Sequence, residues 1–326
     1  MSESVLDIRA VERRFGGGRT LFGRARPGVH AVQGISFEVR RGETLGIVGE
    51  SGCGKSTLAR ILVGLDRPSS GQVRLATADI HDPAQFGSRQ LAKRIQYVFQ
   101  DPLSSLNPRK TIRQILEAPL IYLRNMGEDE RRNTLAEIMD AVRLRPEFLD
   151  RYPHEFSGGQ AQRIGIARAL ASAPEILILD EPVSALDVSV QAQVLNLLDE
   201  LKARFGLTYV FISHDLAVIE SVSDRILVMY FGRVVEEGIA ESLFRHPLHP
   251  YTRLLLSSAP VPGRKTIGAE ERIAELPDPL APPPGCAFAA RCRHVTDLCR
   301  REAPRLERQG ESAYSCHHPR TDEPWP

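Results

Sequence analysis

The chain lacks a long apolar run, a large net charge and a large complement of cysteines, and each absence narrows the class of protein to which it can belong. No apolar stretch in its 326 residues approaches the roughly 18 that indicate a membrane-spanning helix. The N-terminus has no basic segment followed by an apolar core, so no secretory signal is expected. Lysine and arginine total 42 against 41 for aspartate and glutamate, which gives the chain no overall attraction for nucleic acid. We expect a soluble cytoplasmic protein that reaches a membrane only by docking to other subunits.

Cysteine is scarce and unevenly placed. One of the five cysteines is residue 53, and the other four fall in the last part of the chain: Cys286, Cys292, Cys299 and Cys316. In a cytoplasmic chain such a group favours metal binding over disulfides. The gaps exceed the roughly two to four residues usual between zinc-ligating cysteines, and they match no simple ferredoxin spacing. Zinc, an iron–sulfur cluster and unligated thiols therefore remain open, with His294, His317 and His318 as substitute ligands.

Residues 49–56 read Gly-Glu-Ser-Gly-Cys-Gly-Lys-Ser and fill the pattern G-x-x-x-x-G-K-[ST] at every fixed position. The glycines let the backbone curl so that its N–H groups face phosphate oxygens. Lys55 supplies a charge for the β- and γ-phosphates, and Ser56 supplies a hydroxyl for Mg²⁺. An apolar run before the loop and a helical run after it predict a helix N-terminus that faces the anion. The predicted nucleotide-binding residues here are Gly49, Glu50, Ser51, Gly52, Cys53, Gly54, Lys55, Ser56 and Thr57.

Short apolar runs that alternate with helical patterns predict a doubly wound α/β core. The runs 93–99, 175–181 and 208–213 indicate strands, and the last two suit parallel strands covered on both faces. An apolar stripe at 3.6-residue spacing predicts a helix over 189–204, and residues 226–238 read as a hairpin. The ligand is expected at the carboxyl ends of the strands.

The two ends of the chain differ from this core. Residues 1–48 alternate like short strands, with a Gly/Arg-rich segment at 16–28 that we interpret as a hairpin loop, or as a nucleic-acid or phospholipid contact. After residue 245 the composition shifts, and the proline-rich stretch 260–284 indicates a linker before a small Cys-rich appendix.

Four polar residues follow predicted strands, where they would face the ligand. Asp180 and Glu181 end one strand, and adjacent residues there can take different roles: holding the metal and activating water. His214 follows the strand that ends at residue 213, which predicts a γ-phosphate contact. Gln100 also ends a strand, although alone it would indicate little.

Residues 156–160 read Phe-Ser-Gly-Gly-Gln and come directly before a helical pattern. A serine is a good N-cap, and bare glycine backbone at a helix N-terminus can bind an anion. A simple capped helix is the alternative interpretation of this motif. The predicted nucleotide contacts are Ser157, Gly158, Gly159 and Gln160.

These motifs, in this order and together with Ser184-Ala185-Leu186-Asp187, resemble the ATP-binding subunit of an ABC transporter. The stretches 49–57, 100–109 and 152–160, and the tail from His249-Pro250-Tyr251-Thr252 through the four cysteines, are similar to oligopeptide and dipeptide importers. The resemblance covers essentially the whole chain. One departure is Phe156, which stands where the family more often has leucine.

The resemblance implies a P-loop NTPase fold: a RecA-like core, an antiparallel β-subdomain and a helical subdomain over residues 1–245, and a C-terminal extension over 246–326. It implies that two such domains close head to tail around two ATP molecules, so that Ser157, Gly158 and Gly159 face the γ-phosphate held by Lys55 of the other domain. Asp187 would lie at that seam, and Phe15 would stack on adenine.

The same resemblance assigns roles. Lys55, Gln100, Glu181 and His214 would be catalytic, with Glu181 as the base; Ser56, Gln100 and Asp180 would hold Mg²⁺. The four C-terminal cysteines would carry a [4Fe–4S] cluster, with zinc as the alternative.

The implied function is hydrolysis of ATP to energise peptide import at the cytoplasmic face of the membrane. The implied partners are two transmembrane permease subunits, a second identical or homologous ATPase and, indirectly, an extracytoplasmic peptide-binding protein. The alternatives are a soluble ABC ATPase of translation or DNA repair and an iron–sulfur redox protein with a vestigial P-loop. The first usually has two ATPase blocks or a long coiled-coil insertion, which this chain lacks, and the intact Lys55, Asp180, Glu181 and His214 argue against the second.

Overall fold

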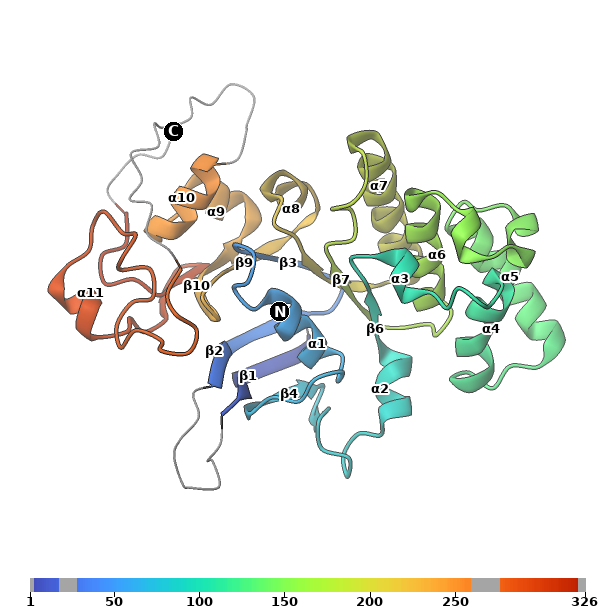
Figure 1. Cartoon of the computed structure of the whole chain (residues 1–326), viewed down its shortest axis with the longest axis horizontal. Helices are drawn as coiled ribbons and strands as arrows, with labels where there is room; N and C mark the ends of the chain where they lie inside the picture. Colours follow the sequence, from blue (N-terminus) through green and yellow to red (C-terminus); the bar gives the residue numbers. More distant parts are fainter. Residues whose placement is uncertain (1–2, 18–27, 259–275, 322–326) are drawn as a thin grey trace.

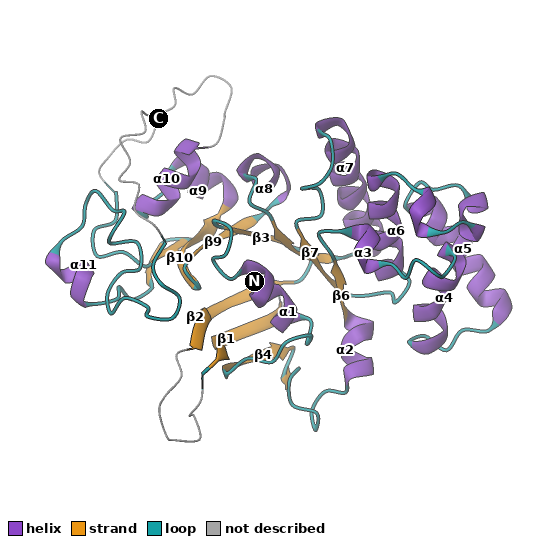
Figure 2. Cartoon of the chain, in the orientation of Figure 1, coloured by secondary structure: helices purple, strands orange, loops and turns teal. Residues whose placement is uncertain are grey.

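The computed structural model describes residues 3–17, 28–258 and 276–321, which form two sheets surrounded by helices (Figure 1). An eight-stranded sheet runs through the middle of the molecule, and a four-stranded antiparallel sheet lies to one side of it (Figure 2). A group of helices extends beyond one edge of the large sheet, at the right of both views. Within the described ranges, every helix is too short or too polar to cross a membrane.

The large sheet has a parallel centre and an antiparallel edge. Its strands are β3 (Thr44–Val48), β6 (Ile95–Val98), β7 (Ile176–Asp180), β8 (Thr208–Ile212), β9 (Arg225–Tyr230), β10 (Arg233–Ile239), β11 (Glu307–Gln309) and β12 (Ser312–Tyr314). They lie in the order β11-β12-β10-β9-β3-β8-β7-β6, and the strands from β9 to β6 are parallel. Every residue of β3, β7, β8 and β9 is buried, as expected for parallel strands covered on both faces.

The small sheet lies near the N-terminus of the chain. Its strands are β1 (Ser4–Gly16), β2 (Gly28–Arg40), β4 (Ser70–Leu75) and β5 (Ala78–Asp79), in the order β2-β1-β4-β5. All three pairs are antiparallel, and the predicted strands of residues 1–48 lie within β1 and β2. The predicted Gly/Arg-rich loop falls almost entirely on residues 18–27, outside the described part of the chain.

Helices cover the sheets and begin at residues that favour a helix start. They are α1 (Lys55–Leu62), α2 (Ser88–Arg94), α3 (Pro102–Ser105), α4 (Ile112–Tyr122), α5 (Glu128–Ala141), α6 (Gly158–Leu170), α7 (Val188–Phe205), α8 (Leu216–Val222), α9 (Ala240–Arg245), α10 (Pro250–Ser258) and α11 (Asp297–Arg301), with short 3₁₀ turns over Pro146–Asp150 and Pro153–Glu155. The Asp101 carboxylate accepts the N–H groups of Leu103 and Ser104 at the start of α3. Helix α7 ends at Gly206, whose φ of 63° suits glycine.

Two apolar clusters lie on opposite faces of the large sheet, because successive strand side chains point to opposite sides. In β8, Val210 and Ile212 join the cluster that contains α1 and the small sheet. Tyr209 and Phe211 join the other cluster, with α4 to α10. The parallel strands therefore hold α1 on one face and most other helices on the other.

The C-terminal residues extend the large sheet instead of forming a separate appendix. Strand β12 pairs with β10, and β11 pairs with β12. Buried Phe288 lies 5.4 Å from the ring of Tyr230 on β9, measured between centroids. The prediction of a separate Cys-rich appendix is thus not supported, because this segment shares the sheet and the core. The predicted linker falls largely on residues 259–275, outside the described ranges.

Candidate nucleotide-binding site

The phosphate-binding loop, residues 49–56, connects buried β3 to α1. Gly54 has a φ of 103°, and a Cβ atom there would lie 2.2 Å from the Ala31 carbonyl oxygen. Gly49 is equally enclosed, since its Cβ would lie 2.2 Å from the carbonyl oxygen of Met229. Only glycine fits both positions, so the surrounding backbone fixes the course of the loop.

The donors in this loop are arranged for an anion. Within the described part of the chain, the N–H groups of Ser51, Gly52, Gly54 and Lys55 have no hydrogen-bond acceptor. The Lys55 side chain is buried, and its ammonium donates to the carbonyl oxygens of Gly49 (2.7 Å) and Glu50 (3.0 Å). Free N–H groups at the start of a helix, beside an ammonium, form a site for phosphate.

Cys53 is the one loop residue with a thiol, and its pKa is raised by burial, although nearby Lys55 opposes that shift. A buried thiol of raised pKa is a poor nucleophile. Its carbonyl oxygen accepts the N–H of Gly232 at 2.9 Å, which ties the loop to the β9–β10 turn. Cys53 therefore contributes packing and backbone geometry.

Asp180 lies at the end of β7 and faces Ser56. The Ser56 hydroxyl donates to Oδ1 at 3.3 Å, and the Tyr97 hydroxyl, from β6, donates to Oδ2 at 2.5 Å. Burial raises the pKa of Asp180 in spite of both hydrogen bonds. Burial and the Asp180 charge together raise the pKa of Tyr97. A buried carboxylate beside a hydroxyl is a hard oxygen donor set that fits Mg²⁺.

Glu181 follows directly and points to different partners. Its φ is 48°, a left-handed conformation that residues other than glycine seldom adopt. Gln100 donates from Nε2 to Glu181 Oε2 at 2.7 Å, and Nδ1 of His214 lies 3.1 Å from Oε1. Gln100 and His214, predicted from two other strand ends, thus both contact the Glu181 carboxylate.

The Ser157–Gln160 segment lies elsewhere. Ser157 precedes α6, and its N–H donates to Oε1 of Gln160 at 3.1 Å. A Cβ at Gly159 would lie 2.5 Å from Val190, so this glycine allows α6 to approach α7. Ser157 and Gly158 are exposed, as is Asp187 at the start of α7. Among the described residues no hydrogen bond links this segment to the phosphate-binding loop; α6 lies with the helices at the right of Figure 1, away from α1.

Phe15 stands near the end of β1 with 38% of its surface exposed. The Arg13 guanidinium lies 4.5 Å from the centre of its ring. An exposed aromatic face is available for stacking. The remaining predicted loop residue, Thr57, lies in the first turn of α1.

The sequence alone did not predict that Tyr97, Tyr251 and Arg291 contact residues of the nucleotide-binding site. Tyr97 was part of a predicted strand, but nothing in the sequence indicated that this strand lies next to β7. Tyr251 and Arg291 contact Glu50 of the loop from far along the chain: the Tyr251 hydroxyl accepts the Glu50 N–H at 3.0 Å, and Arg291 pairs with the Glu50 carboxylate at 2.8 Å. Only the tertiary fold reveals these contacts.

Comparison with family models agrees with this geometry. Residues 32–184 match the ABC transporter family, and residues 235–299 match the C-terminal region of the oligopeptide/dipeptide transporter family. The fold and site thus define an ATP-binding cassette ATPase.

Individual relatives match over nearly the whole chain. The di/tripeptide transport ATP-binding protein DppF of Pseudomonas aeruginosa is 48% identical over 97% of this chain and 98% of its own. The oligopeptide transport ATP-binding protein AppF of Bacillus subtilis is 48% identical over 97% of each chain. The dipeptide transport ATP-binding protein DppF of Escherichia coli is 50% identical over 88% of this chain and 86% of its own.

Solved structures share the fold. The dimeric post-hydrolysis structure of the ATP-binding cassette MJ0796 with ADP and Pi has a TM-score of 0.63 and 31% identity, covering 72% of this chain and 98% of its own. The cbiO1 structure from Clostridium perfringens has the same TM-score and 29% identity, covering 74% and 91%. The chain belongs to the family of ATP-binding subunits of oligopeptide and dipeptide ABC transporters. This membership confirms the predicted P-loop NTPase fold of the ABC type, and it confirms the transport-ATPase class over the alternative of a translation or DNA-repair ATPase.

The predicted [4Fe–4S] cluster is wrong. Cys286, Cys292, Cys299 and Cys316 do line one small cavity, but within the described ranges no three or more His, Cys, Asp or Glu side chains are arranged to hold a metal ion. The relatives are named as ATP-binding proteins, and none of those names mentions a cluster. Nothing supports the zinc alternative either. Burial raises the pKa of the Cys286, Cys292 and Cys316 thiols.

Proposed function

We propose that this chain hydrolyses ATP to energise import of dipeptides or oligopeptides through separate transmembrane permease subunits. The observation that carries the proposal is the meeting of Lys55, Ser56, Asp180 and Glu181 around the end of β3 and its neighbouring strands. Peptide is the substrate class because relatives 46–50% identical carry peptide transport in their names. The role of each residue below is part of the proposal.

Residues 49–57 bind the triphosphate. The free N–H groups of the loop donate hydrogen bonds to phosphate oxygens, and the Lys55 ammonium exchanges its two backbone carbonyl partners for the β- and γ-phosphates. Because the ammonium already lies inside the loop, this exchange needs only a rotation of the side chain. Phe15 stacks on the adenine ring.

Ser56, Asp180 and Gln100 hold Mg²⁺, which neutralises charge on the phosphates when bound. Asp180 would hold the cation as a carboxylate, and a bound Mg²⁺ would oppose the effect of burial, which raises the pKa of this group. Tyr97 orients the Asp180 carboxylate by its short hydrogen bond to Oδ2.

Glu181 accepts the proton of the attacking water. Gln100 and His214 occupy one oxygen each, which fixes the orientation of the carboxylate. His214 is more than half exposed, so it can also reach the γ-phosphate. In this proposal the base, a metal ligand and a phosphate contact act together at the carboxyl ends of the parallel strands, supported by the contacts of Glu181 with Gln100 and His214.

A second ATPase, identical or homologous, completes the site. Ser157, Gly158, Gly159 and Gln160 present a helix N-terminus to solvent instead of to the loop of their own chain. The γ-phosphate of the partner's nucleotide satisfies these donors, and Asp187 lies at the seam. The dimeric cassette MJ0796 supports this arrangement by likeness of fold.

We place the chain at the cytoplasmic face of the membrane, bound to two permease subunits that receive peptide from an extracytoplasmic binding protein. Residues 1–245 form the nucleotide-binding domain, and 246–326 form the extension of the peptide-transporter type. The match of residues 235–299 to that C-terminal region supports this division. Gln100 begins the segment that docks to a permease.

The test is reconstitution of the full chain with its permeases in proteoliposomes. Wild type should release phosphate and accumulate labelled dipeptide only when Mg–ATP is supplied. Lys55→Ala should lose both, while assembly with the permeases is unchanged. Peptide uptake that proceeds without ATP, or ATP hydrolysis without uptake of any dipeptide or oligopeptide, would refute the proposal.

A further inference from the structure

Two residues of the C-terminal region hold the phosphate-binding loop at Glu50. The Tyr251 hydroxyl accepts the backbone N–H of Glu50 at 3.0 Å. Arg291 donates from its guanidinium to the Glu50 carboxylate at 2.8 Å, and this bond raises the pKa of Arg291. Both contacts fall on the second residue of the loop, from positions 201 and 241 residues further along the chain.

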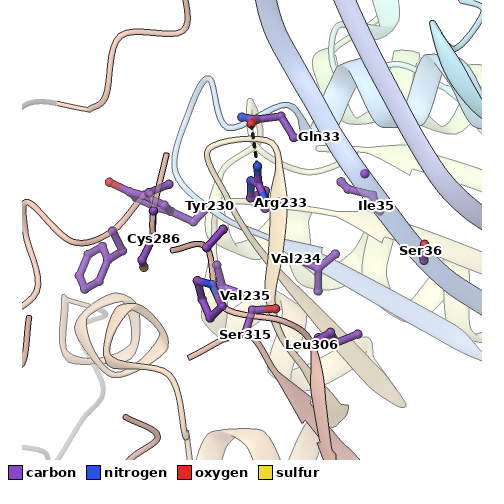
Figure 3. A pocket seen from close by; sticks show the side chains of 16 residues that line it. Gln33, Ile35, Ser36, Tyr230, Arg233, Val234, Val235, Cys286, Leu306 and Ser315 are labelled. Atoms are coloured by element: carbon purple, nitrogen blue, oxygen red, sulfur yellow. Dashed lines mark hydrogen bonds between the residues drawn. The ribbon is translucent and has the colours of Figure 1, made fainter. Parts of the chain in front are cut away.

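The surroundings make these contacts rigid. Tyr251 is fully buried, with its ring 4.6 Å from Tyr230 and 5.5 Å from Phe288 between centroids. The Arg291 guanidinium lies 5.9 Å and 5.8 Å from the same two rings. Figure 3 shows Tyr230 beside Cys286, at the wall of a cavity of about 210 Å³ between this aromatic cluster and β2. The aromatic cluster of Tyr230, Tyr251 and Phe288 thus holds both side chains that contact Glu50.

Each contact has a consequence for phosphate binding. Tyr251 holds the N–H of Glu50, so the loop backbone is anchored next to the free N–H groups of Ser51 and Gly52. Arg291 neutralises a carboxylate that belongs to the loop itself, and an unpaired carboxylate there would repel the triphosphate. Neither effect requires Tyr251 or Arg291 to touch the nucleotide.

We propose that Tyr251 and Arg291 are positioning residues of the nucleotide site, through which the C-terminal region sets the affinity for ATP. This inference rests on the proposed function, because it assumes that residues 49–57 bind ATP. It goes further by giving the peptide-transporter extension a direct role in nucleotide binding.

The test measures binding of a non-hydrolysable ATP analogue with Mg²⁺ by calorimetry, using the full chain. Arg291→Gln and Tyr251→Phe should each raise the Kd about fivefold, equivalent to about 1 kcal/mol at about 1.4 kcal/mol per tenfold. In the complex with permeases, the KM for ATP should rise by a similar factor with little change in kcat. Added to Glu50→Gln, Arg291→Gln should have little further effect, because no carboxylate is then left unpaired.

Two matched control variants distinguish an effect on the position of the loop from a general loss of stability. Arg300→Gln removes an exposed arginine of α11 whose ion pair with Asp297 is local. Tyr209→Phe removes a buried tyrosine hydroxyl that donates to the Leu198 carbonyl oxygen, far from the loop. Both controls should keep the wild-type Kd, even where the melting temperature falls. Should Arg291→Gln fail to fold, Arg291→Lys keeps the charge without the forked geometry and is expected to weaken binding less.

A Kd within about twofold of wild type in both Arg291→Gln and Tyr251→Phe would overturn the inference, and so would an equal loss in the two controls. If ATP binding responds as expected but the complex moves no peptide, the proposed function fails and the inference stands. If wild type binds no ATP, both fail together.

Discussion

Replacing Glu181 with glutamine should stop ATP turnover and leave ATP binding intact. The two side chains have the same shape, so Gln100 and His214 still have a partner at this position. The amide, however, cannot take a proton from water as the carboxylate can. The variant therefore removes the chemistry and keeps the geometry.

The size of the effect follows from that role. Loss of a general base slows a reaction by typically about 10²–10⁴-fold, or about 3–5 kcal/mol of barrier. The Glu181 side chain is mostly buried, and His214 and Gln100 contact one oxygen each, so the base is held in one orientation. We expect the upper half of this range.

The assay is phosphate release at saturating Mg–ATP, with Kd for ATP measured in parallel. In the proposed arrangement two chains close around ATP and separate after hydrolysis, so dimers of Glu181→Gln should accumulate with ATP. His214→Ala serves as a comparison: it frees one carboxylate oxygen and should lower kcat less. A kcat for Glu181→Gln within about tenfold of wild type, below the range for a lost base, would refute the assignment.

Three further changes test the site and its support. Tyr97→Phe removes the donor to Asp180 and should raise the Mg²⁺ concentration for half-maximal ATPase at least about tenfold; an unchanged Mg²⁺ titration would contradict this. Gly54→Ala places a Cβ 2.2 Å from a carbonyl oxygen and should abolish ATP binding, whereas Gly165→Ala, open within α6, should bind normally. Burial raises the pKa of Glu236 from 4.5 to about 7, so as the pH rises this carboxyl group loses its proton in the unfolded chain before it does so in the folded chain. The free energy of unfolding of wild type, relative to Glu236→Gln, should therefore fall by about 3 kcal/mol from pH 4.5 to 7; parallel urea-unfolding profiles against pH would contradict this.

The sequence predicted the local units of the site well. The strand–loop–helix unit at 44–62 and the strand ending at Asp180 depend on short-range patterns, which period and turn chemistry reveal. The helix predicted over 189–204 is α7, which begins and ends within one residue of those bounds. The bounds of such helices and strands follow from the order of apolar and polar residues within each element.

Pairings between distant strands were not predictable. Tyr97 and Asp180 are 83 residues apart, and Gln100 and Glu181 are 81 apart. Both pairs meet because β6 lies next to β7, an order that no periodicity specifies. The wrong expectation of a separate appendix has a similar cause: β11 and β12 have three residues each, too few for a pattern, and all three residues of β11 are exposed.

The cysteine prediction failed for a related reason. Four cysteines close in sequence do come to one cavity, but spacing gives no directions for their side chains. Metal binding needs several donor atoms at one point with fixed geometry. Cysteines that are close in sequence can bring several sulfur atoms to one cavity, but they do not ensure the fixed geometry that a metal ion needs.

Sheet order explains why the loop after β3 is held from two sides. Strand β3 is flanked by β8 and β9, and beyond β8 lies β7, which brings Asp180 to Ser56. On the other side, β9 carries Tyr230, and the chain that follows β10 brings Tyr251 and Arg291 to Glu50. The loop therefore lies between Asp180 and the C-terminal region. The C-terminal region contacts the loop itself at Glu50, whereas Gln100 and His214 hold Glu181, so a change in the C-terminal region should alter phosphate binding more than the position of Glu181.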